Sequence, residues 1–95
     1  MHSYFVTYDI CEPKRWRKVF KTMHGYGRHV QLSVFLCDLD ETRYETLLSA
    51  LEDEIDSAQD QVLLVKIARS GRSTGERIEA LGRPYEHRSP GATIV

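Results

Sequence analysis

The chain has 95 residues, and its 13 Lys and Arg against 14 Asp and Glu leave a net charge of −1. A chain of this length forms one small domain, and 41% hydrophobic with 28% charged residues is typical of a soluble globular protein. The charge excludes a uniformly basic protein, and no apolar run reaches the roughly 18 residues that a membrane span requires.

The first predicted element is a strand over residues 3–10, which is rich in β-branched and aromatic residues and contains no Gly or Pro. Alternation along this strand places Tyr4, Val6 and Tyr8 on one face and Asp9 on the other.

A helix is predicted to begin at Pro13, because proline lacks the N–H that would be unbonded at the first helical position. Gly25 and Gly27 end this helix. Its apolar residues recur with helical spacing and predict a stripe that faces the core, made of Trp16, Val19, Phe20 and Met23.

Residues 28–37 form a second β-rich run, which is long for a single strand. It predicts either one long strand or two short strands joined by a bend near residues 31–33. A second helix is predicted to open with the acids of residues 38–41, which favour the positive end of the helix dipole. Its apolar stripe is Tyr44, Leu47, Leu48, Leu51 and Ile55, and a buried strand follows at residues 61–68.

The C-terminal part carries the signals of a further short helix. Ser73 and Glu76 match a capping box, and the helix is predicted to contain Leu81 and to end before Gly82. Residues 93–95 could add an edge strand.

The order of these elements predicts an α+β fold, a ferredoxin-like β-α-β-β-α-β sandwich with a C-terminal extension, as one domain over residues 1–95. The first and last main strands carry apolar residues on both faces. In a lone sheet with helices on one side, apolar and polar residues would alternate more regularly along each strand, because the other face of the sheet meets water. We therefore expect a second copy of the chain to cover that face, which gives a homodimer through the sheet.

Charge is distributed unevenly along the chain. Residues 1–37 hold six Lys or Arg and two Asp or Glu. Residues 38–60 hold one basic and nine acidic residues, and residues 61–95 hold six basic and three acidic residues. Such asymmetry is typical of a protein with an electrostatic partner such as nucleic acid. Three differently solvated faces explain the pattern equally well.

Asp9 ends the first strand shortly before a helix, where the helix dipole favours an ionised carboxylate. Magnesium commonly uses one or two protein carboxylates and completes its shell with water and substrate oxygens. One Asp per chain would therefore suffice if a dimer brought two together. The alternative is that Asp9 only caps the turn between strand and helix.

The first helix carries five cations around its apolar stripe, and like charges four residues apart cost roughly 0.2–0.5 kcal/mol per pair. A phosphate backbone would offset that cost, and a solvated helix face is the alternative. These residues are Lys14, Arg15, Arg17, Lys18 and Lys21.

Other motifs are weak. Residues 70–75 lack the spacing of a phosphate-binding P-loop. His24, His29, Cys11 and Cys37 lack the paired spacing of a zinc site. The N-terminus lacks a signal peptide pattern, so we expect two reduced thiols in a cytoplasmic protein.

Three segments together resemble the second of the core Cas families, the small CRISPR-associated protein that accompanies the integrase in spacer acquisition. They are residues 6–10 followed by Lys14 and Arg15, residues 26–35, and residues 77–82. The most specific element is the Q-x-S-V-F run at residues 31–35, which follows Tyr26 and Gly27.

The resemblance implies a ferredoxin-like homodimer that binds Mg²⁺ through Asp9, which is then both the metal ligand and the catalytic residue. It implies metal-dependent phosphodiester hydrolysis of single-stranded RNA or double-stranded DNA, and a dimer that bridges two dimers of the CRISPR integrase. Tyr8, Ser33 and Phe35 match the family motif near the paired aspartates. The nucleic-acid contacts expected from the helix and the resemblance are Lys14, Arg15, Arg17, Lys18 and Arg28.

Two functions therefore compete at this stage. One is a magnesium-dependent endonuclease, endoribonuclease by type, that acts in spacer acquisition. The other is a non-catalytic dimeric scaffold that binds DNA and bridges integrase dimers.

Overall fold

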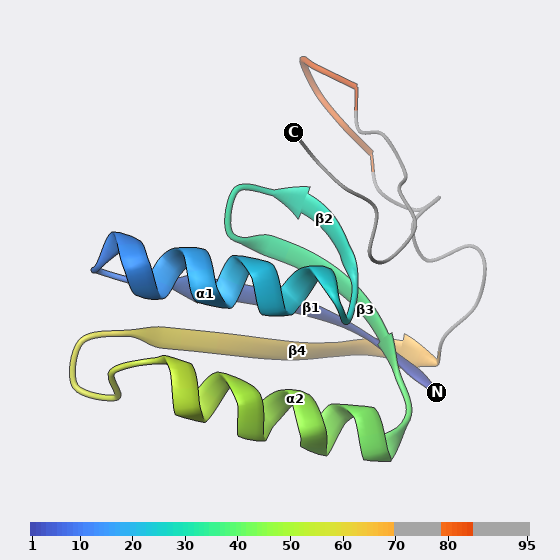
Figure 1. Cartoon of the computed structure of the whole chain (residues 1–95). Coiled ribbons are helices and arrows are strands. Elements are labelled where there is room, and N and C mark those ends of the chain that lie inside the picture. The colour runs from blue at the N-terminus through green and yellow to red at the C-terminus, as the bar shows by residue number, and fades with distance from the viewer. Residues whose placement is uncertain (70–78, 85–95) are drawn as a thin grey trace.

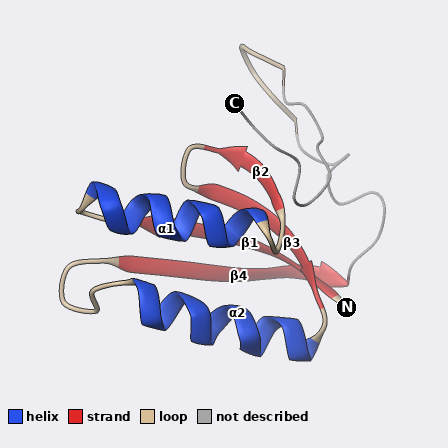
Figure 2. Ribbon diagram, viewed as in Figure 1, coloured by secondary structure: helices blue, strands red, loops and turns tan. Residues whose placement is uncertain are grey.

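Two helices cover one face of a four-stranded antiparallel sheet in the computed structural model, which describes residues 1–69 and 79–84 (Figures 1 and 2). The strands lie in the order β2-β3-β1-β4. This arrangement confirms the predicted ferredoxin-like α+β fold. The elements are β1 (His2–Asp9), α1 (Pro13–His24), β2 (Arg28–Gln31), β3 (Val34–Leu39), α2 (Glu41–Glu54) and β4 (Gln61–Arg69).

The core lies between the sheet and the two helices. Tyr4, Val6 and Tyr8 of the central strand β1 point into it, as their alternation predicted. From the helices, the fully buried contributors are Val19 and Met23 of α1 and Leu47 of α2. The apolar stripes of both predicted helices therefore face the sheet, and they fix the two layers of the fold.

The β-rich run at residues 28–37 divides into two strands, β2 and β3, joined by a turn at Leu32 and Ser33. The two-strand alternative is the one that the structure adopts. The second helix opens with the last two of the predicted residues 38–41, because β3 pairs with β1 as far as Leu39. Asp38 belongs to the strand, and Asp40 is the N-cap, whose carboxylate accepts from the Arg43 backbone N–H at 2.8 Å.

The open face of the sheet is apolar. Phe5 pairs with Val65 across β1 and β4, and Thr7 pairs with Leu63. Leu63, Val65 and Ile67 are 50%, 53% and 40% exposed, which is unusual for large apolar side chains on one strand. This is the face for which the sequence predicted a covering copy of the chain.

The C-terminal helix prediction is wrong in the part that the structure describes. Residues 79–84 form no helix, and Leu81 is 96% exposed, so it has no apolar surface to pack against. Gly82 does adopt the left-handed φ of +84° that its predicted position requires. Ser73, Glu76 and residues 93–95 lie outside the described residues. No helix in the described ranges is long and apolar enough to cross a membrane.

Candidate functional site

Asp9 lies at the last position of β1, exposed, on the sheet face opposite the helices. Its neighbour Tyr8 points into the core, so alternation directs the Asp9 side chain outward. The N-cap of α1 is Glu12, whose carboxylate accepts from the backbone N–H groups of Lys14 and Arg15, so Asp9 does not cap this helix. No donor among the described residues hydrogen-bonds its carboxylate. Such a surface carboxylate is a suitable ligand for a hard cation.

The motif residues Tyr8, Ser33 and Phe35 form packed structure beneath Asp9. Ser33 joins three elements, because its Oγ accepts from the Trp16 indole Nε1 at 3.0 Å and its carbonyl accepts from the Tyr8 N–H at 3.1 Å. The Tyr8 and Phe35 rings stack in the core with centroids 6.4 Å apart. Burial raises the pKa of the Tyr8 hydroxyl, which has no hydrogen-bond partner in the described part of the chain.

The predicted nucleic-acid contacts divide into two groups. Lys14, Arg17 and Lys18 are exposed on α1. Arg15 and Arg28 instead bind the protein's own carboxylates. The Arg15 Nε lies 2.8 Å from Asp60 Oδ2, and an Arg28 terminal nitrogen lies 3.4 Å from Asp38 Oδ2.

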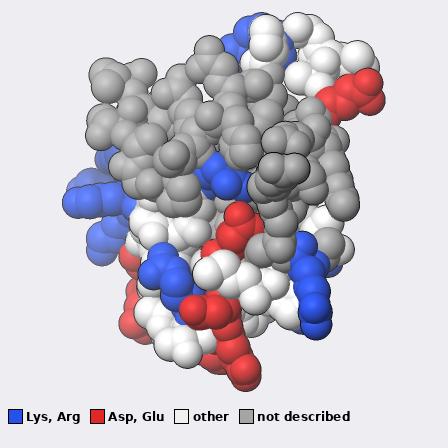
Figure 3. Space-filling model, turned by 90° about the vertical axis from the view of Figure 1, so that its right-hand side faces the viewer, with Lys and Arg blue, Asp and Glu red and all other residues white. Residues whose placement is uncertain are grey.

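One face of the molecule carries its charges in separate groups (Figure 3). The blue Lys and Arg side chains there alternate with red Asp and Glu side chains rather than forming a continuous basic stripe. The described residues of a single chain therefore do not form a uniformly basic surface on this side.

Asp60 is a functional candidate that the sequence did not single out. It is buried at the end of the loop between α2 and β4, and its carboxylate accepts from Arg15 and from the backbone N–H groups of Cys11 and Asp56. The hydrogen bond from the Arg15 guanidinium holds the pKa of Asp60 well below its usual range. No local pattern identifies this carboxylate, because its main partner lies 45 residues away.

The described residues contain no group of three or more His, Cys, Asp or Glu side chains that could hold a metal ion. His24 and His29 come close, with ring centroids 5.8 Å apart, but they pack among phenylalanine rings. Burial raises the pKa of the Cys37 thiol to about 12, so it is a poor metal ligand at neutral pH. Asp9 supplies one exposed carboxylate per chain, which fits magnesium because this cation commonly uses only one or two protein carboxylates.

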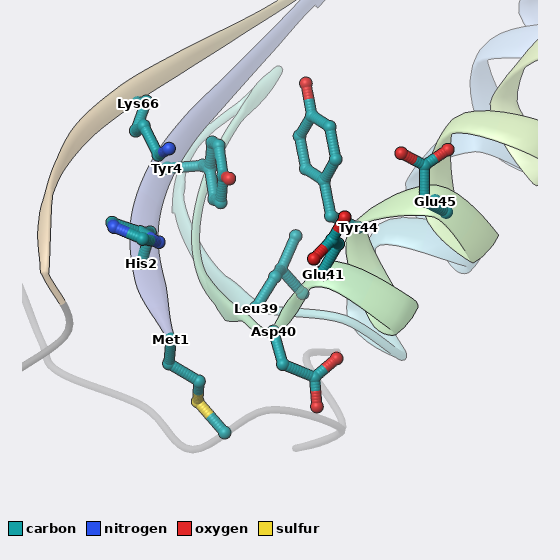
Figure 4. A pocket seen from close by; sticks show the side chains of 9 residues that line it. All are labelled: Met1, His2, Tyr4, Leu39, Asp40, Glu41, Tyr44, Glu45 and Lys66. Atoms are coloured by element: carbon teal, nitrogen blue, oxygen red, sulfur yellow. The ribbon is translucent and has the colours of Figure 1, made fainter.

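A pocket of about 460 Å³ lies at the opposite end of β1 from Asp9 (Figure 4). Tyr4 and Tyr44 stack in it with centroids 4.7 Å apart. Acidic side chains of the α2 N-terminus form one side, and His2 and Lys66 form the other. This pocket contains none of the predicted site residues.

Residues 1–74 match the family described as CRISPR associated protein Cas2. The chain is 46% identical over 94 residues to the CRISPR-associated endoribonuclease Cas2 1 of Rhodospirillum rubrum, covering 99% of this chain and 91% of that protein. It is 36% identical over 94 residues to the CRISPR-associated endoribonuclease Cas2 of Geobacter sulfurreducens, covering 99% of this chain and 98% of that protein. The fold is similar to the crystal structure of Streptococcus pyogenes Cas2, with a TM-score of 0.71 and 30% sequence identity. The similarity covers 84% of this chain and 99% of that chain.

Proposed function

Because this chain belongs to the Cas2 family of CRISPR-associated proteins, we propose that it is a magnesium-dependent endonuclease of CRISPR spacer acquisition. Its relatives from Rhodospirillum rubrum and Geobacter sulfurreducens are named endoribonucleases, which supports hydrolysis of phosphodiester bonds. The observation that carries the proposal is the Asp9 carboxylate, which is exposed at the end of β1 and takes no hydrogen bond from a described residue.

The proposed active unit is a homodimer in which the open sheet faces meet. Burial of Leu63, Val65 and Ile67 would remove an apolar surface from water, and this gain favours association. Asp9 lies on the same face and would project toward the interface from each copy. Two Asp9 carboxylates would then hold the magnesium, which supplies polarisation of the phosphoryl oxygen and activation of water when bound.

The substrate is a polynucleotide, RNA or double-stranded DNA, bound through its phosphates. Lys14, Arg17 and Lys18 of α1 are exposed near the end of β1 that carries Asp9, and they supply the proposed phosphate contacts. Arg15 and Arg28 contribute less, because Asp60 and Asp38 already bind them. We also propose the CRISPR integrase as protein partner of the dimer, as the sequence resemblance implies.

The test is a cleavage assay on single-stranded RNA and duplex DNA, with Mg²⁺ or with EDTA. Asp9→Asn should abolish cleavage while the fold and the dimer persist. Asp53→Asn, which makes the same change at an exposed position of α2, should cleave as the wild type does. Undiminished cleavage by Asp9→Asn would contradict the proposed mechanism, in which Asp9 holds the magnesium.

The second candidate is the non-catalytic scaffold, which the exposed cations of α1 favour because phosphate binding requires no chemistry. Reversing the charges of Lys14, Arg17 and Lys18 should then impair DNA binding and spacer acquisition, whereas Asp9→Asn should leave both intact. Acquisition at the wild-type level after the reversal would contradict the scaffold.

A further inference from the structure

Asp9 pairs with a neighbouring strand on one side only, although β1 is a central strand. The pairing of β1 with β3 ends at Thr7, which lies opposite Val34. Beyond that point Asp9 pairs only with Gln61, the first residue of β4. The position of Asp9 therefore depends on how β4 begins and on how the chain leaves β1.

Asp60 contacts both of these segments. It directly precedes Gln61, and its Oδ1 accepts from the backbone N–H of Cys11, two residues after Asp9, at 3.0 Å. A second contact reinforces the connection, because the Cys11 thiol donates to the Gln59 carbonyl at 3.1 Å. The carboxylate thus joins the loop after β1 to the loop before β4, directly beyond the Asp9–Gln61 pair.

Arg15 fixes this carboxylate in turn. Its Nε donates to Asp60 Oδ2 at 2.8 Å, and the Asp56 backbone N–H donates to the same oxygen at 2.9 Å. None of the Asp60 side chain is exposed, and the Arg15 side chain is 25% exposed. The guanidinium hydrogen bond lowers the pKa of Asp60, so the carboxylate stays ionised and bonded across the neutral range.

We propose that Asp60 is the positioning residue for Asp9 and acts through the Cys11 N–H and Arg15 without touching metal or substrate. The inference rests on the proposed function, in which Asp9 is the metal ligand. It assigns Arg15 to the support of the site rather than to phosphate binding. Outer partners that orient metal ligands typically change metal affinity or activity by about 10–100-fold when mutated.

The decisive variant is Asp60→Asn, which keeps the size of the side chain but removes its charge. Mg²⁺ is titrated into the protein, and the NMR signal of the Asp9 amide reports binding without any catalytic step. We expect Mg²⁺ binding to weaken by about tenfold or more. The Mg²⁺ concentration for half-maximal cleavage should rise in parallel, with the KM for the polynucleotide unchanged.

Thr22→Val is the matched control. It removes the 2.6 Å hydrogen bond from Thr22 to Glu54, which joins α1 to α2 and involves none of Asp9, Cys11 and Asp60. This variant should lose stability and keep the Mg²⁺ affinity of the wild type. If it weakens Mg²⁺ binding as much as Asp60→Asn does, general destabilisation explains both results and the positioning role is overturned.

Arg15→Lys covers the case in which Asp60→Asn does not fold. It keeps the positive charge but loses the Nε donor, so it should weaken Mg²⁺ binding in the same direction by a smaller factor. If Asp9→Asn abolishes cleavage but these two variants bind Mg²⁺ as the wild type does, only the positioning role fails. If Asp9 shows no Mg²⁺ response in the wild type, the proposed function fails and the positioning role falls with it.

Discussion

The Nε of Arg15 lies 2.8 Å from Oδ2 of Asp60, a residue 45 positions further along the chain. This pair separates Arg15 from its neighbours Lys14, Arg17 and Lys18, which are exposed on the same helix. Cations that look equivalent in the sequence therefore have different roles. Those that are exposed can release counterions on phosphate binding, and the one that is bonded stabilises the fold.

Lys18→Gln and Arg15→Gln should accordingly change different properties, the first DNA binding and the second stability. Lys18→Gln should reduce the slope of log affinity for duplex DNA against log salt by about one and leave the melting temperature unchanged. Arg15→Gln should lower the melting temperature and leave the slope nearly unchanged, because its charge is already neutralised by Asp60. Salt titrations of DNA binding and thermal unfolding measure both. Equal slopes for the two variants would contradict the distinction.

Val65→Glu should dissociate the proposed homodimer. Val65 is 53% exposed on the open sheet face, and the variant would place a charge from each copy in an apolar interface. An unpaired buried charge costs about 3–5 kcal/mol, which weakens association by more than about a hundredfold. Light scattering over a concentration series gives the mass. Glu52→Lys, on the exposed side of α2, is the control and should leave the mass unchanged.

Ser33→Ala should destabilise the fold through Trp16. The variant removes the acceptor of the 3.0 Å hydrogen bond from the indole Nε1, at a cost of about 1 kcal/mol. In a domain of this size that lowers the melting temperature by roughly 4–8 °C. Ser49→Ala, at an exposed position of α2, should change it little. Equal melting temperatures for the two variants would show that the Trp16–Ser33 bond contributes nothing.

Stability should fall as the pH drops below about 6.5, the unperturbed histidine value. Burial lowers the pKa of His24 below the ordinary histidine value, and the neighbouring His29 imidazole lowers it further. The unfolded chain therefore binds the His24 proton more readily than the folded chain does. The contribution of neutral His24 to stability is complete above about pH 6.5 and is lost as the pH falls toward the pKa of the folded state. His2, whose pKa is also lowered, acts in the same direction.

His24→Gln should therefore reduce, but not abolish, the loss of melting temperature between about pH 7.5 and about pH 5.5. His2→Gln should reduce the remaining part. An unchanged pH dependence in the double variant would show that neither imidazole is responsible.

The secondary structure was largely predictable because its signals are local. The alternation of Tyr4, Val6 and Tyr8 and the helical spacing of Trp16 to Met23 each lie within one element. Within the predicted helix start at residues 38–41, only Asp40 and Glu41 open the helix, because two elements compete for these residues. Acids favour a helix start, but pairing with β1 keeps Asp38 and Leu39 in the strand. Leu81, which the sequence placed in a C-terminal helix, lies 96% exposed in a segment, residues 79–84, that forms no helix.

The sequence by itself determined the α+β layer order, the family, and the place of Asp9 at the end of a strand, because periodicity, turn residues and motifs are properties of neighbouring positions. The tertiary structure decided which cations are free and which are paired, and it identified Asp60. That carboxylate meets Arg15 and the Cys11 N–H only after α2 has brought the start of β4 beside the end of β1. Partners so distant along the chain leave no local pattern, so only the folded arrangement shows what holds Asp9 in place.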